Sequence, residues 1–201
     1  MTRILIILVC FVQALTMYAQ TADEFLETGN AKYELQDYQG AIADFNKAME
    51  LMPNDARAYY NRGNSKYALQ DYRGAIADYN KAIELNRDDA RAFNNRGITK
   101  IAVQDYQGAI ADFNKVIELT PNDASAFYNR GNAKYELQDD RGAIADYNKA
   151  IELKPNYANA FLNRGIVYIQ LGNKDAGCLD FSKAAELGEG KAYEAIKKFC
   201  K

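Results

Sequence analysis

The chain has 201 residues, of which 48% are hydrophobic and 26% charged, with three prolines and neither tryptophan nor histidine. This composition is typical of a folded, helical chain and argues against a disordered one. The formal net charge is −2 and the lysines are spread along the whole sequence, so the basic patch of a nucleic-acid-binding protein is missing and no nucleic-acid partner is expected.

Residues 1–19 have the pattern of a secretory signal peptide. Arg3 precedes an apolar run from Ile4 to Leu15, and polar and small residues follow as far as Ala19. The run is about 12 residues long, against the ~20 that span a bilayer, so a permanent membrane anchor is the less favoured alternative. We expect cleavage after Ala19, a secreted or periplasmic protein, and no stable membrane span after cleavage.

A repeat of 34 residues fills the rest of the sequence. Glycine recurs at this interval from Gly29 to Gly165, and GAIADFNKAMEL recurs in register in near-identical copies. The repeats are residues 22–55, 56–89, 90–123, 124–157 and 158–191, within a single repeat domain over residues 20–201. A capping helix is expected at about residues 190–201.

Each repeat predicts two helices. The first is expected to begin at an aromatic residue, and the second to follow a QDY or QDD segment whose aspartate can cap it. Pro53, Pro121 and Pro155 end the second helix, and Arg87 replaces the proline in the second repeat. The aromatic residues are Phe25, Tyr59, Phe93, Phe127 and Phe161, and the capping aspartates are Asp37, Asp71, Asp105 and Asp139.

One helix pair cannot bury its own apolar face, so successive pairs must stack. Small residues are expected where helices approach closely, and two further rows predict continuous core stripes. The small residues are Ala41, Ala75, Ala109 and Ala143. The stripes are Leu51, Leu85, Leu119, Leu153 and Leu187, and Phe45, Tyr79, Phe113, Tyr147 and Phe181.

The 34-residue period, with its small residue, aromatic, alanine and terminal proline, resembles the tetratricopeptide repeat family over most of the chain. The resemblance implies an all-α fold: a right-handed superhelical solenoid of antiparallel helix pairs whose first helices line a concave face. This sequence departs from the family pattern where arginine replaces leucine, at Arg62, Arg96, Arg130 and Arg164, and where lysine replaces tyrosine, at Lys32, Lys66, Lys100 and Lys134.

The recurring arginine and lysine are like charges four residues apart on one helix face, so they need an acidic partner. An aspartate recurs sixteen residues after the arginine, within reach across an antiparallel helix pair. We therefore expect Arg62 to pair with Asp78, Arg96 with Asp112, Arg130 with Asp146 and Arg164 with Asp180. Pairing between neighbouring repeats fits the spacing equally well, and a row of arginines that binds an acidic ligand is the functional alternative.

The resemblance also implies a binding surface. In similar repeats an asparagine just before the arginine position contacts the backbone of an extended peptide, and a carboxamide can both donate and accept. Further asparagines and tyrosines lie beside this row; the alternative is that all of them are solvated helix faces. The candidate binding residues are Asn61, Asn95, Asn129, Asn163, Asn64, Asn132, Tyr60, Tyr67, Tyr128 and Tyr135.

Catalytic and metal-binding patterns are missing. The absence of histidine removes the commonest general base and most zinc sites, and no phosphate-binding glycine loop is present, so we expect no enzyme, no metal site and no cofactor. Cys178 and Cys200 remain after signal cleavage. A disulfide between them could hold the tail, in which Tyr193, Ile196 and Phe199 have helical spacing; buried free thiols are the alternative.

The sequence as a whole predicts a scaffold or adaptor that binds a protein or peptide segment on its concave face. Two alternatives stay open. One is a structural or self-associating component of the cell envelope, and the other is a binder of a cell-wall polymer through the tyrosine and asparagine rows.

Overall fold

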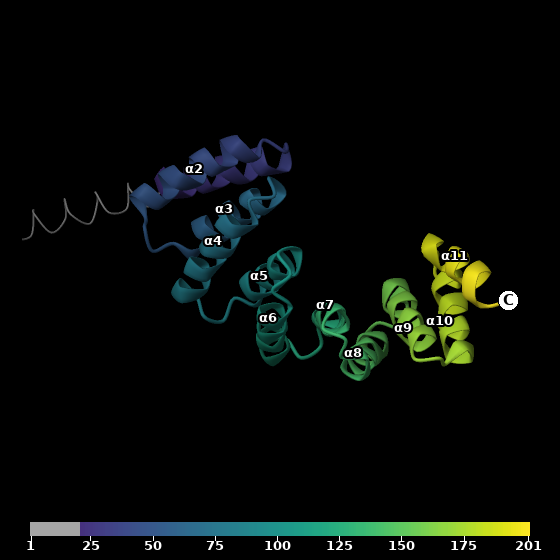
Figure 1. The fold of residues 1–201 in the computed structure, drawn as a ribbon. Helices are drawn as coiled ribbons and strands as arrows, with labels where there is room; N and C mark the ends of the chain where they lie inside the picture. The colour runs from purple at the N-terminus through teal and green to yellow at the C-terminus, as the bar shows by residue number, and fades with distance from the viewer. Residues whose placement is uncertain (1–20) are drawn as a thin grey trace, which may run out of the picture. The chain divides into compact units, whose positions relative to one another are not determined.

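The computed structural model describes residues 21–201, which fold into α-helices joined by short loops (Figure 1). The expected signal peptide lies outside the described residues. The first described helix covers residues 21–34. It is followed by α2 (Tyr38–Leu51), α3 (Ala56–Ala68), α4 (Tyr72–Leu85), α5 (Ala90–Ala102), α6 (Tyr106–Leu119), α7 (Ala124–Glu136), α8 (Asp140–Leu153), α9 (Ala158–Gln170), α10 (Lys174–Glu186) and α11 (Gly190–Phe199).

The described residues form two compact units, one up to Thr99 and one from Lys100 onward, and the division falls within α5. We call them unit 1 and unit 2. In unit 1, α3 packs against both α4 and α2. In unit 2, each helix from α6 to α11 packs against the next one in the chain. The predicted all-α architecture of consecutive packed helix pairs is confirmed.

The predicted caps of the second helices are present. The side chains of Asp37, Asp71, Asp105 and Asp139 each accept a hydrogen bond from the backbone N–H of the glycine three residues later. Each such bond satisfies one of the N–H groups that a helix leaves unpaired in its first turn. The second helices end just before the three prolines, and α4 ends at the equivalent residue although Arg87 stands in place of proline.

The predicted start of the first helices is wrong by three residues. Helices α3 and α7 begin at Ala56 and Ala124, before the aromatic residue. The reason is a second set of aspartate caps: Asp55 accepts from the N–H of Arg57, and Asp123 from that of Ser125. Asp89 accepts from Arg91 in the same way at the start of α5.

Each of the first four repeats ends its first helix with a glutamine in the left-handed region, at φ values of 62° to 63° for Gln36, Gln70, Gln104 and Gln138. The fifth repeat has Gly172 there, with φ 79°. A residue other than glycine is strained in this conformation, by roughly 1–2 kcal/mol. The turn between the paired helices therefore has the same backbone in all five repeats, although only one has the residue that favours it.

The core contains the expected alanines and one of the two expected stripes. The four alanines are 0% exposed, and the aromatic stripe from Phe45 to Phe181 is at most 1% exposed. The leucine stripe is only half-buried, because each leucine is the last residue of its helix or its C-cap. The fully covered positions one turn earlier are Ala48, Ala82, Val116, Ala150 and Ala184.

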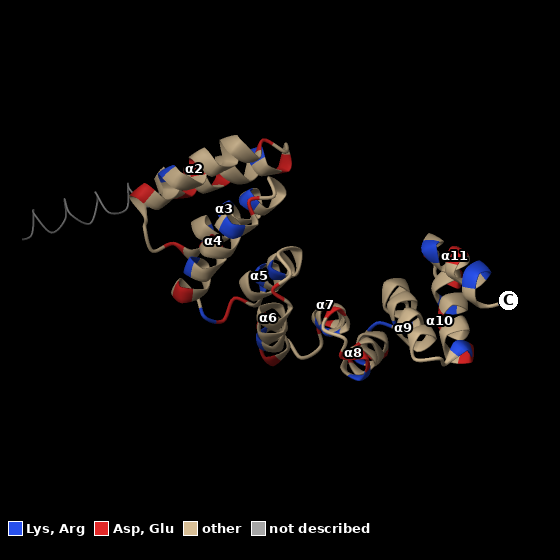
Figure 2. Cartoon of the chain, viewed as in Figure 1, with Lys and Arg blue, Asp and Glu red and all other residues tan. Residues whose placement is uncertain are grey.

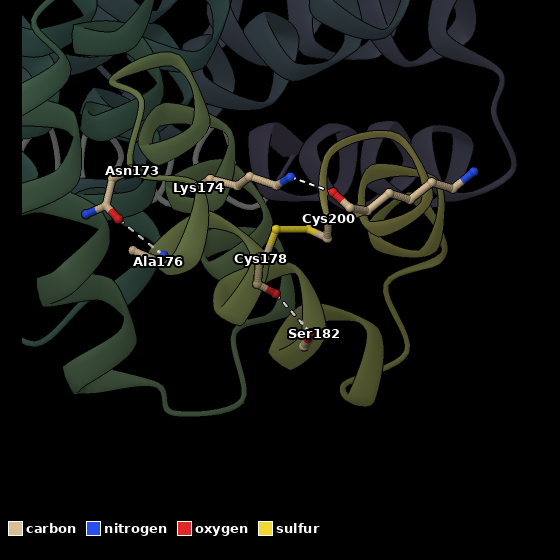
Figure 3. The surroundings of a disulfide bond; sticks show 7 residues. Asn173, Lys174, Ala176, Cys178, Ser182 and Cys200 are labelled. Carbon is tan, nitrogen blue, oxygen red and sulfur yellow. Dashed lines mark hydrogen bonds between the residues drawn. A yellow bond between two sulfur atoms is a disulfide. The ribbon is translucent and has the colours of Figure 1, made fainter.

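Helix α11 covers the apolar end of unit 2. Ile196 and Phe199 pack on a cluster that includes Leu162 and Phe181, whereas Tyr193 is 59% exposed and only its hydroxyl is engaged, donating to the carbonyl oxygen of Ala185 at 3.2 Å. Cys178 of α10 and Cys200 after α11 form a disulfide (Figure 3). Nearby, the Lys174 ammonium donates to the carbonyl oxygen of Lys201 at 2.6 Å.

Candidate functional site on the first helices

The recurring charged residues form a compact ion-pair motif. In unit 2, Arg130 donates from Nε and Nη2 to the two carboxylate oxygens of Asp146, at 2.9 and 2.6 Å. Lys134 lies 2.8 Å from the same carboxylate, which is 4% exposed. Arg62 and Lys66 hold Asp78 in the same way in unit 1, and Arg164 holds Asp180. These three expected pairs are present; Arg96 with Asp112 would join residues of the two units and stays a prediction.

Each of these arginines also bonds to the preceding repeat. Nη1 of Arg130 donates to Asn114 Oδ1 at 2.7 Å, and Arg62, Arg96 and Arg164 donate likewise to Asn46, Asn80 and Asn148. The guanidinium group thus joins an aspartate of its own repeat, in the pairs described above, to an asparagine of the repeat before. For Arg164, the hydrogen bonds to Asp180 raise the pKa above its usual value despite burial. These bonds favour a structural role over the binding of an acidic ligand.

The first repeat departs from this motif, because Thr28 stands where the others have arginine. Asp44 is 4% exposed and has Lys32 at 2.6 Å. Burial acts to raise the pKa of this carboxyl, yet the hydrogen bond and charge of Lys32 hold it below the usual value. A hydrogen bond from Thr28 and the charge of Lys47 act in the same direction, so this buried aspartate stays ionised without an arginine.

A pocket of about 310 Å³ lies on the first helices of unit 1. It includes three of the predicted binding residues, Asn64, Tyr67 and Asn95. The other lining residues are Tyr33, Tyr79 and Ile98.

The polar groups of this pocket form one hydrogen-bond network. The hydroxyl of Tyr79 donates to Asn64 Oδ1 at 2.8 Å, and Asn95 Nδ2 donates to the same oxygen at 2.9 Å. Asn95 Nδ2 uses its second hydrogen toward the hydroxyl oxygen of Tyr60, at 3.1 Å. The carboxamide orientations of Asn64 and Asn95 are therefore fixed by their partners.

Unit 2 contains the same network and a second pocket, of about 380 Å³. Tyr147 donates to Asn132 Oδ1 at 2.8 Å, and Asn163 Nδ2 donates to Asn132 Oδ1 at 2.9 Å and to the Tyr128 hydroxyl at 3.1 Å. This pocket is lined by Ile101, Asn132, Tyr135, Glu136, Tyr147, Asn163 and Ile166.

The two network tyrosines are fixed as donors. Burial, the largest cause, raises the pKa of Tyr79 and Tyr147 well above the usual value, so both hydroxyls stay protonated at neutral pH. Asn64 Oδ1 and Asn132 Oδ1 each accept two hydrogen bonds, while their Nδ2 groups have no partner within residues 21–201. Each pocket thus keeps a carboxamide donor for another molecule.

The remaining predicted residues lie near the pockets but outside their linings. Tyr60 packs on Tyr79 with ring centroids 6.1 Å apart, and Tyr128 packs on Tyr147 at 6.0 Å. Asn61 donates to Asn30 Oδ1 at 2.9 Å, in a neighbouring groove of unit 1. Asn129 is half-buried on α7 and makes no hydrogen bond with any other described side chain.

Sequence reasoning assigned Tyr79 and Tyr147 to the core alone. Their rings are buried, but their hydroxyls reach the pocket asparagines. A signal was present in the sequence: the aromatic core row reads Phe, Tyr, Phe, Tyr, Phe, and asparagine precedes each tyrosine by fifteen residues. A buried tyrosine needs a hydrogen-bond partner, and that spacing supplies one.

Charged residues of both signs are mixed over the surface, and the described residues offer no metal site. Lysine and arginine are interspersed with aspartate and glutamate along the helices of both units (Figure 2). Within residues 21–201, no three acidic or cysteine side chains are grouped so that they could hold a metal ion. None of the helices formed by these residues has both the length and the apolar character needed to span a bilayer.

Models of two tetratricopeptide repeat families match the sequence, at residues 29–69, 101–138 and 131–172 for one and at residues 56–89 for the other. The chain belongs to the tetratricopeptide repeat family. A comparison with curated protein sequences found no significant match.

Solved structures with the same fold agree with this assignment. A crystal structure of MamA has 27% sequence identity and a TM-score of 0.77, over 82% of this chain and 96% of that one. MamA from Desulfovibrio magneticus RS-1 has 20% identity and a TM-score of 0.80, over 83% and 94%. YrrB, a tetratricopeptide repeat protein with an unusual peptide-binding site, has 23% identity and a TM-score of 0.78, over 93% and 97%. At these identities the last two show the fold alone.

Proposed function

We propose that the chain is a non-enzymatic adaptor that binds an extended segment of a partner protein along the first helices of each unit. The observation that carries the proposal is the repeated network of Asn64, Tyr79 and Asn95 in unit 1 and Asn132, Tyr147 and Asn163 in unit 2. The family supports a role in protein interactions, because its repeat arrays are typically scaffolds.

The network leaves one hydrogen-bond donor and one acceptor available, and these are the two groups that a backbone peptide unit can bind. In unit 2, Asn132 keeps its Nδ2 donor and Asn163 keeps its Oδ1 acceptor, both in the lining of one pocket. A backbone C=O can accept from the first and a backbone N–H can donate to the second. Because both carboxamides are held by buried or packed tyrosines, they are oriented before the ligand arrives, which lowers the entropic cost of binding.

Export from the cytoplasm is part of the proposal. The signal-like pattern of residues 1–19 supports it, and so does the disulfide, because disulfides persist mainly in oxidising compartments. We propose a secreted or periplasmic location with cleavage after Ala19.

The test is binding to an array of capped, uncharged peptides of mixed sequence. The variant Asn64→Asp/Asn132→Asp keeps both Oδ1 acceptors but replaces the outward donors with oxygen. It should fold normally and lose roughly tenfold or more in peptide affinity, since a carboxylate repels a backbone carbonyl. The control Asn54→Asp/Asn122→Asp makes the same charge change at two exposed loop positions.

Three results would contradict the proposal. Equal binding by the wild-type chain and the pocket variant would place the ligand on another surface. Binding to cell-wall glycans but not to peptides would favour polymer recognition. Concentration-dependent growth in sedimentation, without any peptide binding, would favour the self-associating alternative.

A further inference from the structure

The pockets of units 1 and 2 are lined by residues at equivalent positions of the repeat, so we describe them as two copies. Six lining residues of the first pocket match six of the second at a constant separation of 68 residues, which is two repeats. The pairs are Tyr33 with Ile101, Asn64 with Asn132, Tyr67 with Tyr135, Tyr79 with Tyr147, Asn95 with Asn163 and Ile98 with Ile166. The two pockets therefore share their asparagines, two tyrosines and an isoleucine, but Tyr33 replaces Ile101 in unit 1, and there Asn95 Oδ1 accepts from Asn94 Nδ2 at 3.1 Å.

The second copy has an extension with two carboxylates, whereas the polar groove that adjoins the first copy and shares Tyr33 and Asn64 with it has one, Glu34. A polar pocket of about 460 Å³, lined by Tyr135, Glu136, Gln138, Asp140 and Gln170, shares Tyr135 and Glu136 with the apolar pocket of unit 2. The residues of unit 1 that correspond to Glu136 and Asp140 are Ala68 and Tyr72. Tyr72 packs on Tyr67 there, with ring centroids 5.5 Å apart.

The two carboxylates of this extension have no cationic partner. Neither Glu136 nor Asp140 forms an ion pair with any residue of the described part of the chain. Glu136 instead interacts with Tyr106: together with burial, its negative charge raises the pKa of that phenol. Two carboxylates without a cationic partner, next to an apolar pocket, are complementary to an apolar side chain with a cation beside it.

We propose that unit 2 recognises a peptide segment in which an apolar side chain lies next to a lysine or arginine, while the equivalent pocket of unit 1, with Glu34 as the single carboxylate of its adjoining groove, selects a neighbouring cation less strongly. The apolar side chain enters between Tyr135, Ile101 and Ile166, and the cation lies between Glu136 and Asp140. This inference rests on the proposed peptide-binding function and adds the chemistry of its ligand.

The test uses capped peptides with one leucine placed beside, or one residue away from, a lysine, a glutamine or a glutamate, in both sequence orders. Binding to the wild-type chain is followed by fluorescence anisotropy at two salt concentrations. We expect the best lysine peptide to bind roughly three- to tenfold tighter than its glutamine counterpart, the range expected for one or two partly exposed ion pairs. This advantage should shrink at high salt.

Two reciprocal variants assign the preference to the pocket. Glu136→Ala/Asp140→Tyr gives unit 2 the residues of unit 1 and should reduce the lysine preference to the weaker one of unit 1, while glutamine peptides still bind. Ala68→Glu/Tyr72→Asp gives unit 1 the residues of unit 2 and should convert its weak lysine site into a second tight one, so that two lysine peptides bind with equal, high affinity. Glu24→Ala/Glu194→Ala makes the same change in net charge at exposed positions outside both pockets and should preserve the preference.

Each contrary result has a defined meaning. If no peptide binds, the proposed function and this inference fail together. If peptides bind and Asn64→Asp/Asn132→Asp weakens them, but lysine and glutamine peptides bind equally, only the inference fails. If the preference is undiminished in Glu136→Ala/Asp140→Tyr, or if that variant instead abolishes self-association of the chain, the acidic extension has another occupant and the inference is overturned.

Discussion

At the scale of single residues, stability centres on the buried aspartates of the second helices. Asp146 lies between the guanidinium group of Arg130 and the ammonium group of Lys134, and the arginine also reaches Asn114 in the preceding repeat. A buried carboxylate is costly without a partner, so these cations stabilise the fold chiefly by compensating its desolvation. The first repeat shows a reduced form of the motif, in which Lys32 and the hydroxyl of Thr28 are the partners of Asp44.

The variant Arg130→Thr copies this reduced form into unit 2. Removing a whole partner from a buried ion pair costs about 3–5 kcal/mol, and because Lys134 remains we expect a loss of about 2 kcal/mol in the free energy of unfolding. Urea denaturation followed by circular dichroism measures it. The control Lys149→Ala removes an exposed pair with Glu152 and should change the stability by less than about 0.5 kcal/mol. Similar losses in the two variants would show that the buried pair contributes no more than a surface pair.

At the scale of helices, the sequence contains most of the information about the fold. The 34-residue period, the aspartate caps and the prolines predicted the second helices, because each of these signals acts locally. The starts of the first helices were missed because the recurring aromatic residue was taken as the first helical position, whereas Asp55 and Asp123 come earlier and accept hydrogen bonds from the first N–H groups. The QDY segment indicated a break at Gln70, but its left-handed conformation gave no signal, since glutamine is not a residue that favours positive φ.

The candidate site was less predictable than the helices. The resemblance placed Asn64, Asn95 and Tyr67 on one surface, and all three line the pocket of unit 1. Sequence spacing could not show that the carboxamides bond to one another, because this depends on distances between neighbouring helices. It also could not show that the tyrosine hydroxyls from the core determine which atoms of Asn64 and Asn132 remain available.

The disulfide that attaches α11 to α10 leads to a prediction at the scale of helices. The disulfide joins residues 22 positions apart, and a loop of this size is worth about 3 kcal/mol in the chain-entropy account. We expect Cys178→Ala/Cys200→Ala to lower the free energy of unfolding by about 2–4 kcal/mol, with α11 kept in place by Ile196 and Phe199. Denaturation with and without reductant tests this: reductant should weaken the wild-type chain and leave the variant unchanged. An equal response of both proteins would contradict a stabilising bond.

At the scale of the whole molecule, the repeat has two periods. The helices and ion pairs recur every 34 residues, whereas the tyrosine–asparagine network recurs every 68, once in each unit. The residues that recur every 34 positions pack the helices together, and those that recur every 68 positions form the candidate binding site. Since Phe113 and Phe181 fill the same core position without a hydroxyl and are 0% exposed, the ring is needed for packing and the hydroxyl for the network.

This separation makes a quantitative prediction for Tyr79→Phe and Tyr147→Phe. Each change keeps the buried ring and removes one hydrogen bond, at a cost of about 1 kcal/mol in the free energy of unfolding, because the asparagine oxygen keeps its second donor. The two networks share no residue, so the double variant should lose the sum of the single losses to within about 0.5 kcal/mol. Urea unfolding of the four proteins completes the cycle. A coupling well above that figure would mean that the networks of the two units act as one, and the pockets could then no longer be treated as independent copies.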